Sequence, residues 1–350
     1  MELTKRLRWI DLCKGILIIC MVLGHVGNFT NKAGVDNAHL GFWWIVAMWY
    51  IPFFMQTFFV LSGYTSNFNK NCKAFFSSMV RSLVIPFVVF AILQQAFCMV
   101  VLDYDFMITV GGGKYDFITE SFWFLPALFI AKTIYYFLNK YVKNLYIIGI
   151  VLILIMICGF MITLSYSEFE MPGHYNNYLH YRNGLCMAFF IWIGVWLKRL
   201  EEKPARRLLF VSTIVYLFAM SLTMLLNRLG VDTSLVTPVA YSHWVTISSI
   251  FQIIPYLFYA TTGSFAVILL SQTIEKNKIL EQFGKNSIVI YLIHFVVMVA
   301  SVKLLSNYML PSNKLLGYLF FIIVGCSTLL VSLLFAKIVN TKYLKWMIGK

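Results

Sequence analysis

The amino-acid sequence predicts an all-α, polytopic membrane protein with about ten transmembrane helices and both termini in the cytoplasm. Its residues are 60% hydrophobic and only 12% charged, whereas globular proteins carry about 25% charged residues. The apolar residues gather into stretches near the ~20 residues that an α-helix needs to cross a bilayer. The basic residues outside those stretches fall mainly on one side of the membrane, which predicts the orientation.

The ten predicted helices run through the whole chain, so we expect a single transmembrane domain over residues 1–350. The second predicted helix is long and contains Pro52, while the sixth is short. The helices cover approximately residues 9–28, 41–66, 79–102, 120–139, 144–165, 183–198, 207–227, 247–271, 285–304 and 315–338.

The net charge of +14 follows from this topology and does not indicate a nucleic-acid partner. With the N-terminus in the cytoplasm, most lysines and arginines between the helices lie in inner loops, which is the positive-inside pattern. The C-terminus then also lies inside. The outer side holds only Lys32, Lys114, Arg182, Arg228, Lys303 and Lys314.

The first predicted helix carries two ionisable residues, Lys14 and His25, within an apolar sequence. No small-residue cleavage site follows it, so we expect the segment to be retained rather than removed as a signal peptide. Eleven residues separate the two side chains, which is about three helical turns and roughly 16 Å along one face. Ionisable residues in membrane helices usually face the bundle interior and mark a pathway or a site.

Polar residues also recur at helical spacing in later helices, where they form continuous seams because residues three and four apart are neighbours. One such seam could simply join helices through hydrogen bonds. Seams on several helices favour a wet cavity or tunnel. The seams consist of Pro52, Gln56 and Gly63 in the second helix, Gln252, Pro255, Tyr259 and Thr262 in the eighth, and Ser287, Tyr291, His294 and Ser301 in the ninth.

A series of short motifs occurs in order along nearly the whole chain. The motifs are Trp9 to Gly15, Gly24-His25, Pro52-Phe53-Phe54, Phe59 to Tyr64, Arg81 before Ile85-Pro86-Phe87, Trp123 to Phe129, Phe189-Phe190 with Gly194, Phe283 to Ser287, and Ile290 to His294. Each motif alone is weak, but their joint order resembles the integral-membrane acyltransferase-3 family. The chain resembles in particular its fucose 4-O-acetylase-like branch, which acetylates sugars.

The resemblance implies transfer of an acyl group, usually acetyl, from cytoplasmic acetyl-CoA to a hydroxyl of a glycan or lipid-linked saccharide. It also implies that His25 is catalytic and that Lys14 belongs to the same motif. The wider family often has arginine at the position of Lys14, and lysine lacks the bidentate fork of arginine. Together with the basic inner loops, the resemblance predicts a multi-pass protein of a bacterial inner membrane.

The chemistry of the residues fits this reaction, because O-acylation needs a base to accept the hydroxyl proton and histidine is the usual one. We expect His25 near the outer end of its helix and Lys14 near the inner end, where an anionic CoA head would bind. The predicted catalytic residues are His25, His294 and Glu120, the predicted donor-binding residues are Lys14, Arg81 and Lys73, and the predicted acceptor-binding residues are Trp123, His180 and Arg182. The cysteines lack paired metal-type spacing, so we expect no metal.

Several of these residues also have a structural interpretation. His25 could serve only a contact between helices. Lys14 could pair with Asp11 on the same helix face and extend to the inner headgroups. His294 could be a core histidine bonded to Tyr291 or to a carbonyl group. Arg81 could be an ordinary anchor on the inner side, and Glu120 a solvated carboxylate at the start of a helix.

A different functional class is also open from the sequence. A proton-coupled secondary transporter or exporter of a small metabolite could use Lys14, His25 and His294 as a proton relay. Transporters often contain paired repeats with broken helices, and we find no such symmetry. A non-catalytic membrane partner of a glycan-assembly complex is a third possibility, and the sequence is also compatible with a homo-oligomer.

Overall fold

The computed structural model describes residues 7–32, 46–100, 122–167, 181–200, 202–231, 253–274, 276–306, 308 and 313–349. Within these ranges the chain is all helical and contains no strand, in agreement with the predicted class. The helices are α1 (Arg8–Lys32), α3 (Phe54–Thr65), α4 (Cys72–Met79), the π-helix η2 (Val80–Val84), α5 (Ile85–Val100), α8 (Phe124–Tyr141), α9 (Leu145–Ser167), α10 (Tyr181–Arg199), α11 (Glu202–Arg228), α12 (Ile253–Thr273), α13 (Lys278–Lys285), α14 (Ser287–Ser306), α15 (Lys314–Val339) and the 3₁₀ helix η5 (Lys345–Ile348).

Seven helices in the described part of the chain are long and apolar enough to cross a membrane. They are Arg8–Gly27, Cys72–Phe97, Leu145–Ile162, Ala205–Arg228, Ile253–Thr273, Ser287–Ser306 and Lys314–Val339. The protein is therefore a multi-pass membrane protein. Each of the other three predicted segments also contains a helix, namely α3, α8 and α10, but α3 has only 12 residues and the other two carry charged side chains.

The second predicted segment, residues 41–66, is not one continuous helix in its described part. The backbone forms turns at residues 49–53, and α3 begins only at Phe54. Pro52 explains the interruption, because proline disfavours the helical conformation of the residue before it and has no N–H for a helical hydrogen bond. By contrast, Pro86 lies within the continuous helical segment of α4, η2 and α5. There the π-helix Val80–Val84 ends two residues before the proline, and kinks or irregular turns of this kind commonly accompany proline in helices.

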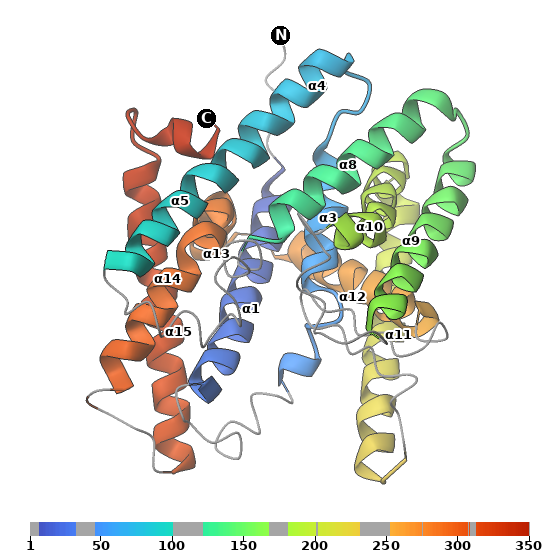
Figure 1. Ribbon diagram of the computed structural model, residues 1–350. Helices are drawn as coiled ribbons and strands as arrows, with labels where there is room; N and C mark the ends of the chain where they lie inside the picture. Colours follow the sequence, from blue (N-terminus) through green and yellow to red (C-terminus); the bar gives the residue numbers. More distant parts are fainter. Residues whose placement is uncertain are drawn as a thin grey trace.

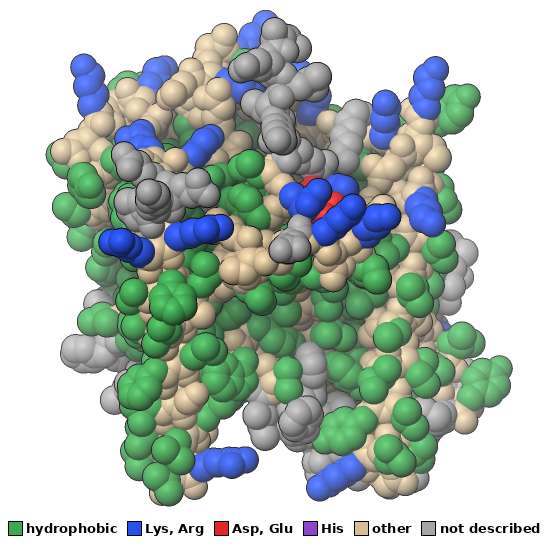
Figure 2. Space-filling model, turned by 180° about the vertical axis from the view of Figure 1, so that it is seen from behind, with side chains coloured by type: hydrophobic (Ala, Val, Ile, Leu, Met, Phe, Trp, Pro, Cys, Tyr) green, Lys and Arg blue, Asp and Glu red, His purple; other side chains and the backbone are tan. Residues whose placement is uncertain are grey.

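The outside of the bundle is strongly apolar. Large hydrophobic side chains are exposed along the outer helices, including Ile150 and Leu154 on α9, Phe218 on α11 and Leu334 on α15. Figure 2 shows hydrophobic side chains forming a broad band across the lower half of the molecule, with most lysines and arginines above it. Such a surface matches a bilayer, because the polar ends of a membrane protein lie in the headgroup regions and the apolar band contacts hydrocarbon.

Helix α1 occupies the centre of the bundle, in contact with α3, α12, α13, α14 and α15 (Figure 1). The start of α1 and the end of α15 lie at the same end of the molecule. Short α13 crosses α1 so closely that a Cβ at Gly15 would meet the carbonyl of Leu280, and a Cβ at Gly284 would meet the carbonyl of Asp11. Small residues commonly permit such approaches between membrane helices.

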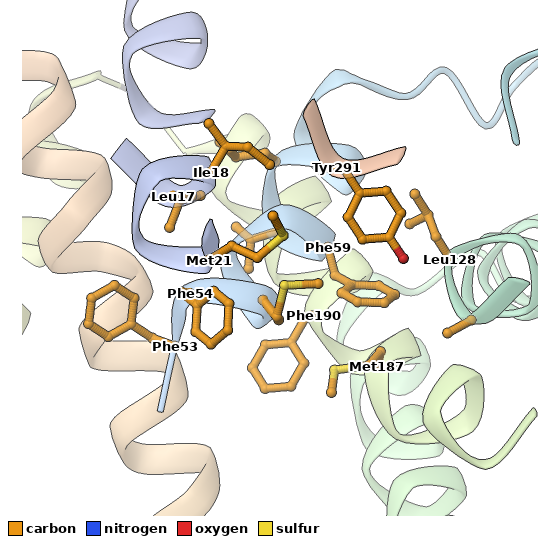
Figure 3. Packing of buried hydrophobic residues seen from close by; sticks show 14 of the residues in the cluster. Leu17, Ile18, Met21, Phe53, Phe54, Phe59, Leu128, Met187, Phe190 and Tyr291 are labelled. Carbon is orange, nitrogen blue, oxygen red and sulfur yellow. The ribbon is translucent and has the colours of Figure 1, made fainter. Parts of the chain in front are cut away.

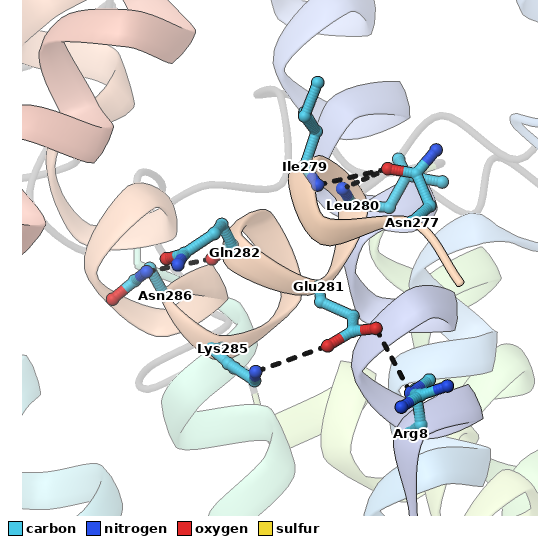
Figure 4. A network of polar contacts seen from close by, with 8 residues as sticks. All are labelled: Arg8, Asn277, Ile279, Leu280, Glu281, Gln282, Lys285 and Asn286. Atoms are coloured by element: carbon cyan, nitrogen blue, oxygen red, sulfur yellow. Dashed lines mark hydrogen bonds and ion pairs between the residues drawn. The ribbon is translucent and has the colours of Figure 1, made fainter.

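Ion pairs and a helix cap strengthen the crossing of α1 and α13 (Figure 4). Glu281 accepts from Arg8 on α1 at 3.3 Å and from Lys285 at 3.4 Å. The side chain of Asn277 caps α13 by accepting from the backbone N–H groups of Ile279 and Leu280. The two motifs Trp9 to Gly15 and Phe283 to Ser287, distant in sequence, therefore meet at this crossing and hold the segment that contains Lys14.

Replacing Gly194 with alanine is expected to destabilise the bundle by about 3 kcal/mol, the upper part of the range for overpacked cores. A Cβ at Gly194 of α10 would collide with the backbone carbonyl of Val60 in α3, so the two helices would have to separate. Thermal unfolding of the purified protein in detergent tests this expectation. Gly325→Ala is the matched control, because its Cβ would meet side chains and no backbone, namely Leu23 at 3.0 Å and Val26 at 3.9 Å. Equal melting temperatures for the two variants would contradict the prediction.

Candidate active site

One face of α1 carries Lys14, Ile18 and Met21 on successive turns, and His25 continues the same face one turn further. Lys14, Ile18 and Met21 line a cavity of about 170 Å³. The arrangement is the one that the eleven-residue spacing predicts. The cavity thus runs along the central helix of the bundle, from Lys14 in the direction of His25.

Four further elements close the cavity around this face of α1. Lys14 lies near the start of α1, where Thr65 ends α3 and Ser287 begins α14. Figure 3 shows Tyr291 of α14 between Ile18 and Met21 on one side and Leu128 of α8 on the other, and all four residues line the cavity. The remaining lining residues are Met55, Phe58, Ser62, Leu83, Phe124, Leu125 and Ile288. The cavity is therefore a mainly apolar channel with a cation and hydroxyl groups at one end.

Two histidines lie together beyond the deep end of this cavity. The ring of His25 meets the ring of His294 edge to face, with 5.2 Å between the ring centroids. Tyr291, which lines the cavity, stacks on His294 at 6.0 Å, and Phe295 packs edge-on against His25 at 5.5 Å. Residues from helices α1 and α14, far apart in sequence, thus form one imidazole pair enclosed by aromatic rings.

Hydrogen bonds to the backbone determine which ring nitrogen of each histidine is available. The Nδ1–H of His25 donates to the carbonyl of Met21 at 2.8 Å, and the Nδ1–H of His294 donates to the carbonyl of Tyr291 at 2.7 Å. A carbonyl can only accept, so each Nδ1 carries a hydrogen and each neutral ring keeps its lone pair on Nε2. The His25 ring is half-buried, which leaves it the more accessible base of the pair.

His294 has the more unusual environment. Its side chain is only 1% exposed, and its Nε2 is buried without a hydrogen-bond partner among the described residues. Leaving a buried polar atom unpaired costs about 1–3 kcal/mol, so such an atom in a native structure calls for a functional explanation. The bond from Nδ1 to the Tyr291 carbonyl matches the structural interpretation of His294, but that interpretation leaves Nε2 unexplained.

Tyr291 also connects α14 to the beginning of α8. Its hydroxyl accepts a hydrogen bond from the backbone N–H of Phe124 at 3.2 Å, and its ring packs against the ring of Phe124. This N–H belongs to the first turn of α8, where no helical partner is available. The contact fixes the position of the tyrosine that both lines the cavity and stacks on His294.

The other predicted site residues are not gathered around this cavity. Lys73 and Arg81 are exposed and are not among its lining residues, and Arg81 donates to the hydroxyl of Ser77 at 3.1 Å. Trp123 and Arg182 are 3% and 4% exposed, so both lie inside the bundle. Glu120 and His180 lie outside the described residues.

One residue near the cavity was not selected from the sequence. Lys132 follows Leu125 and Leu128 along the same face of α8, and both leucines line the cavity. A charged residue inside a predicted membrane helix is the same signal that drew attention to Lys14. Among the residues that the structure describes, no group of three or more histidine, cysteine, aspartate or glutamate side chains could hold a metal ion.

Comparison with known families gives one match, which covers nearly the whole chain. The acyltransferase-3 model, described as an acyltransferase domain, matches residues 7–337. The matched region includes Lys14, the histidine pair and every helix that lines the cavity. No curated protein and no solved structure matches the chain.

Proposed function

The chain belongs to the acyltransferase-3 family and is a membrane acyltransferase, and we propose that it transfers acetyl from acetyl-CoA to a hydroxyl of a glycan. The acceptor would be a cell-surface or exported polysaccharide or its lipid-linked precursor. We assign the chain to the fucose 4-O-acetylase-like branch on the motifs described above. In this proposal residues 1–350 form one transmembrane domain of ten helices in a bacterial inner membrane, with both termini in the cytoplasm.

The observation that carries this proposal is the cavity along α1, which Lys14 lines at one end and which reaches Met21, one helical turn before His25. An acyl-CoA donor has an anionic head, a narrow pantetheine arm and a terminal thioester. Lys14 would attract the head, and the apolar channel would hold the arm. About 16 Å of helix separates Lys14 from His25, which is comparable to the length of an extended arm. The thioester would then reach His25 from inside the bundle.

His25 would act as the general base. Its Nε2 takes the proton of the acceptor hydroxyl while the hydroxyl oxygen attacks the thioester carbonyl carbon. The tetrahedral intermediate then collapses, the carbon–sulfur bond breaks, and the proton on Nε2 passes to the departing CoA thiolate. The bond from Nδ1 to the Met21 carbonyl supports this role, because it keeps the lone pair on Nε2 and fixes the ring orientation.

His294 would assist from α14. Its unpaired Nε2 provides a polar position next to His25, where a water molecule or a reacting group could bind. We also propose that Arg81 and Lys73 guide the donor on the cytoplasmic surface. We further propose that Glu120, Trp123, His180 and Arg182 contact the acceptor. Trp123 and Arg182 are not among the lining residues of the donor cavity, so the acceptor would bind at a separate place.

Transfer of radiolabelled acetyl from acetyl-CoA to endogenous glycan tests the function directly. Membranes that contain the wild-type protein are expected to give base-labile label on glycan, and membranes without the protein are expected to give none. Label that resists mild base would contradict an O-acetyl product. If no label appears with any acetyl acceptor while the membranes show proton-coupled flux of a metabolite, the transporter interpretation would replace the proposed one.

A further inference from the structure

Lys132 extends the cavity face of α8 beyond the apolar lining. It lies four residues after Leu128 and seven after Leu125, so all three side chains share one side of the helix. The lysine is half-buried rather than exposed, unlike Lys140 two turns further along the same helix. Lys132 therefore lies between the part of α8 that lines the cavity and the C-terminal end of that helix.

Two further lysines lie within electrostatic range of Lys132. They are Lys14, on the cavity face of α1, and Lys70, in the connection between α3 and α4. Neither Lys70 nor Lys132 forms an ion pair with a carboxylate that the structure describes. Glu281, for example, pairs with Arg8 and Lys285 instead. Lys132 is therefore close enough to two cations from other elements to be repelled by both.

The connection that carries Lys70 is held firmly against α8. Phe68 packs on the ring of Tyr135 at 4.5 Å, and the hydroxyl of Tyr136 donates to the backbone carbonyl of Lys70 at 3.1 Å. Tyr136 also stacks on Phe75 of α4 at 4.2 Å. Tyr136 lies one turn after Lys132, so these contacts fix the backbone of Lys70 near the lysine of α8. The cluster is thus built into the packing of the helices.

We propose that Lys14, Lys70 and Lys132 together bind the phosphate groups of the acyl donor at the mouth of the cavity. This inference rests on the proposed function and adds Lys132 and Lys70 to the donor-binding residues. Lysine is a common ligand of phosphate, where it acts as a compact point charge. A multiply charged phosphate head would offset the repulsion of Lys132 by the other two lysines, while the uncharged arm of the donor continues between Leu128 and Ile18 toward His25.

Binding of CoA and of pantetheine to the purified full-length protein tests this inference, because pantetheine has the same arm without the phosphates. Lys132→Met keeps an unbranched side chain close to the length of the lysine stem and removes the charge. It is expected to weaken CoA binding about tenfold at low salt, since a hydrogen bond to a charged group contributes about 1.5–3 kcal/mol. Pantetheine binding is expected to stay unchanged. The difference for CoA should shrink at high salt because ions screen the attraction.

Lys140→Met is the matched control, as an exposed lysine on the same helix. It is expected to bind CoA as the wild type does. Thermal unfolding adds a second readout. Without CoA, Lys132→Met is expected to melt at a higher temperature than the wild type, because one member of a repelling cluster is gone. With CoA, the wild type is expected to gain more in melting temperature than the variant.

Several results would overturn the inference. Equal weakening of CoA and pantetheine binding, or a lower melting temperature without CoA, would give Lys132 a purely structural role. Unchanged CoA binding in Lys132→Met, with acetyl transfer intact in the wild type, would refute the inference alone. A wild-type protein that binds CoA with the expected dependence on Lys132 but labels no acceptor would refute the proposed function and leave the phosphate site. Absence of CoA binding to the wild type would refute both.

Discussion

Replacing His25 with alanine is expected to lower acetyl transfer to glycan by about a hundred- to ten-thousandfold, the usual contribution of a general base. The substitution removes the Nε2 that would accept the hydroxyl proton, while the donor cavity, lined by Lys14, Ile18 and Met21, stays intact. CoA binding should therefore change little. The measurement is base-labile radiolabel per unit of protein in membranes with matched expression.

Two companion variants make this result specific. Lys303→Ala changes an exposed residue of α14 and should transfer acetyl as the wild type does. His294→Ala removes the partner ring 5.2 Å from His25 and should reduce transfer less, by about tenfold, because it leaves the base in place. Full transfer by His25→Ala at equal expression would exclude His25 from the chemistry. An equal loss in His25→Ala and Lys303→Ala would point to failed folding or assay conditions.

The central helix shows how much of the site the sequence contains. The spacing of Lys14 and His25 predicts one shared face, because the geometry of a helix depends only on its own residues. Both motifs of the α1–α13 crossing are also visible in the sequence, with glycines where the backbones approach. The partner of His25 could not be predicted in this way. His294 comes from another helix, and only the packing of the bundle brings the two rings together.

Other differences have particular physical causes. Pro52 interrupts the second predicted helix, and hydropathy alone does not detect this break because the turn residues around it are apolar. Arg81 lies in one of the motifs on which the family resemblance is based. In the structure it belongs to a π-helix, where its side chain is exposed and its guanidinium donates to the hydroxyl of Ser77. Lys132 was detectable by the rule that selected Lys14, but its significance depends on Leu125 and Leu128 facing the cavity.

Filling the cavity provides the second large expected effect. Ser62→Trp places an indole into a cavity of about 170 Å³ between α3, α1 and α8. The ring would occupy the path of the pantetheine arm and leave the Lys14 and His25 side chains themselves unchanged. Displacing a substrate from its reactive position by about 1 Å can cost a hundredfold in rate, so transfer is expected to fall at least about a hundredfold. Acetyl transfer and CoA binding would be measured on the same preparation.

The controls for this variant separate blockage from misfolding. Ser62→Ala removes only a hydroxyl and should keep most of the activity, while Ser78→Trp places the same indole on an exposed site of α4 and should leave transfer unchanged. The channel is the donor path only if Ser62→Trp loses both transfer and CoA binding and still melts near the wild-type temperature. Retained transfer in this variant would mean that the thioester reaches His25 by another route. The cavity would then not be the donor path, although His25 could still be the general base. The two large predictions therefore test the two halves of the mechanism independently, the base at one end and the donor path that leads to it.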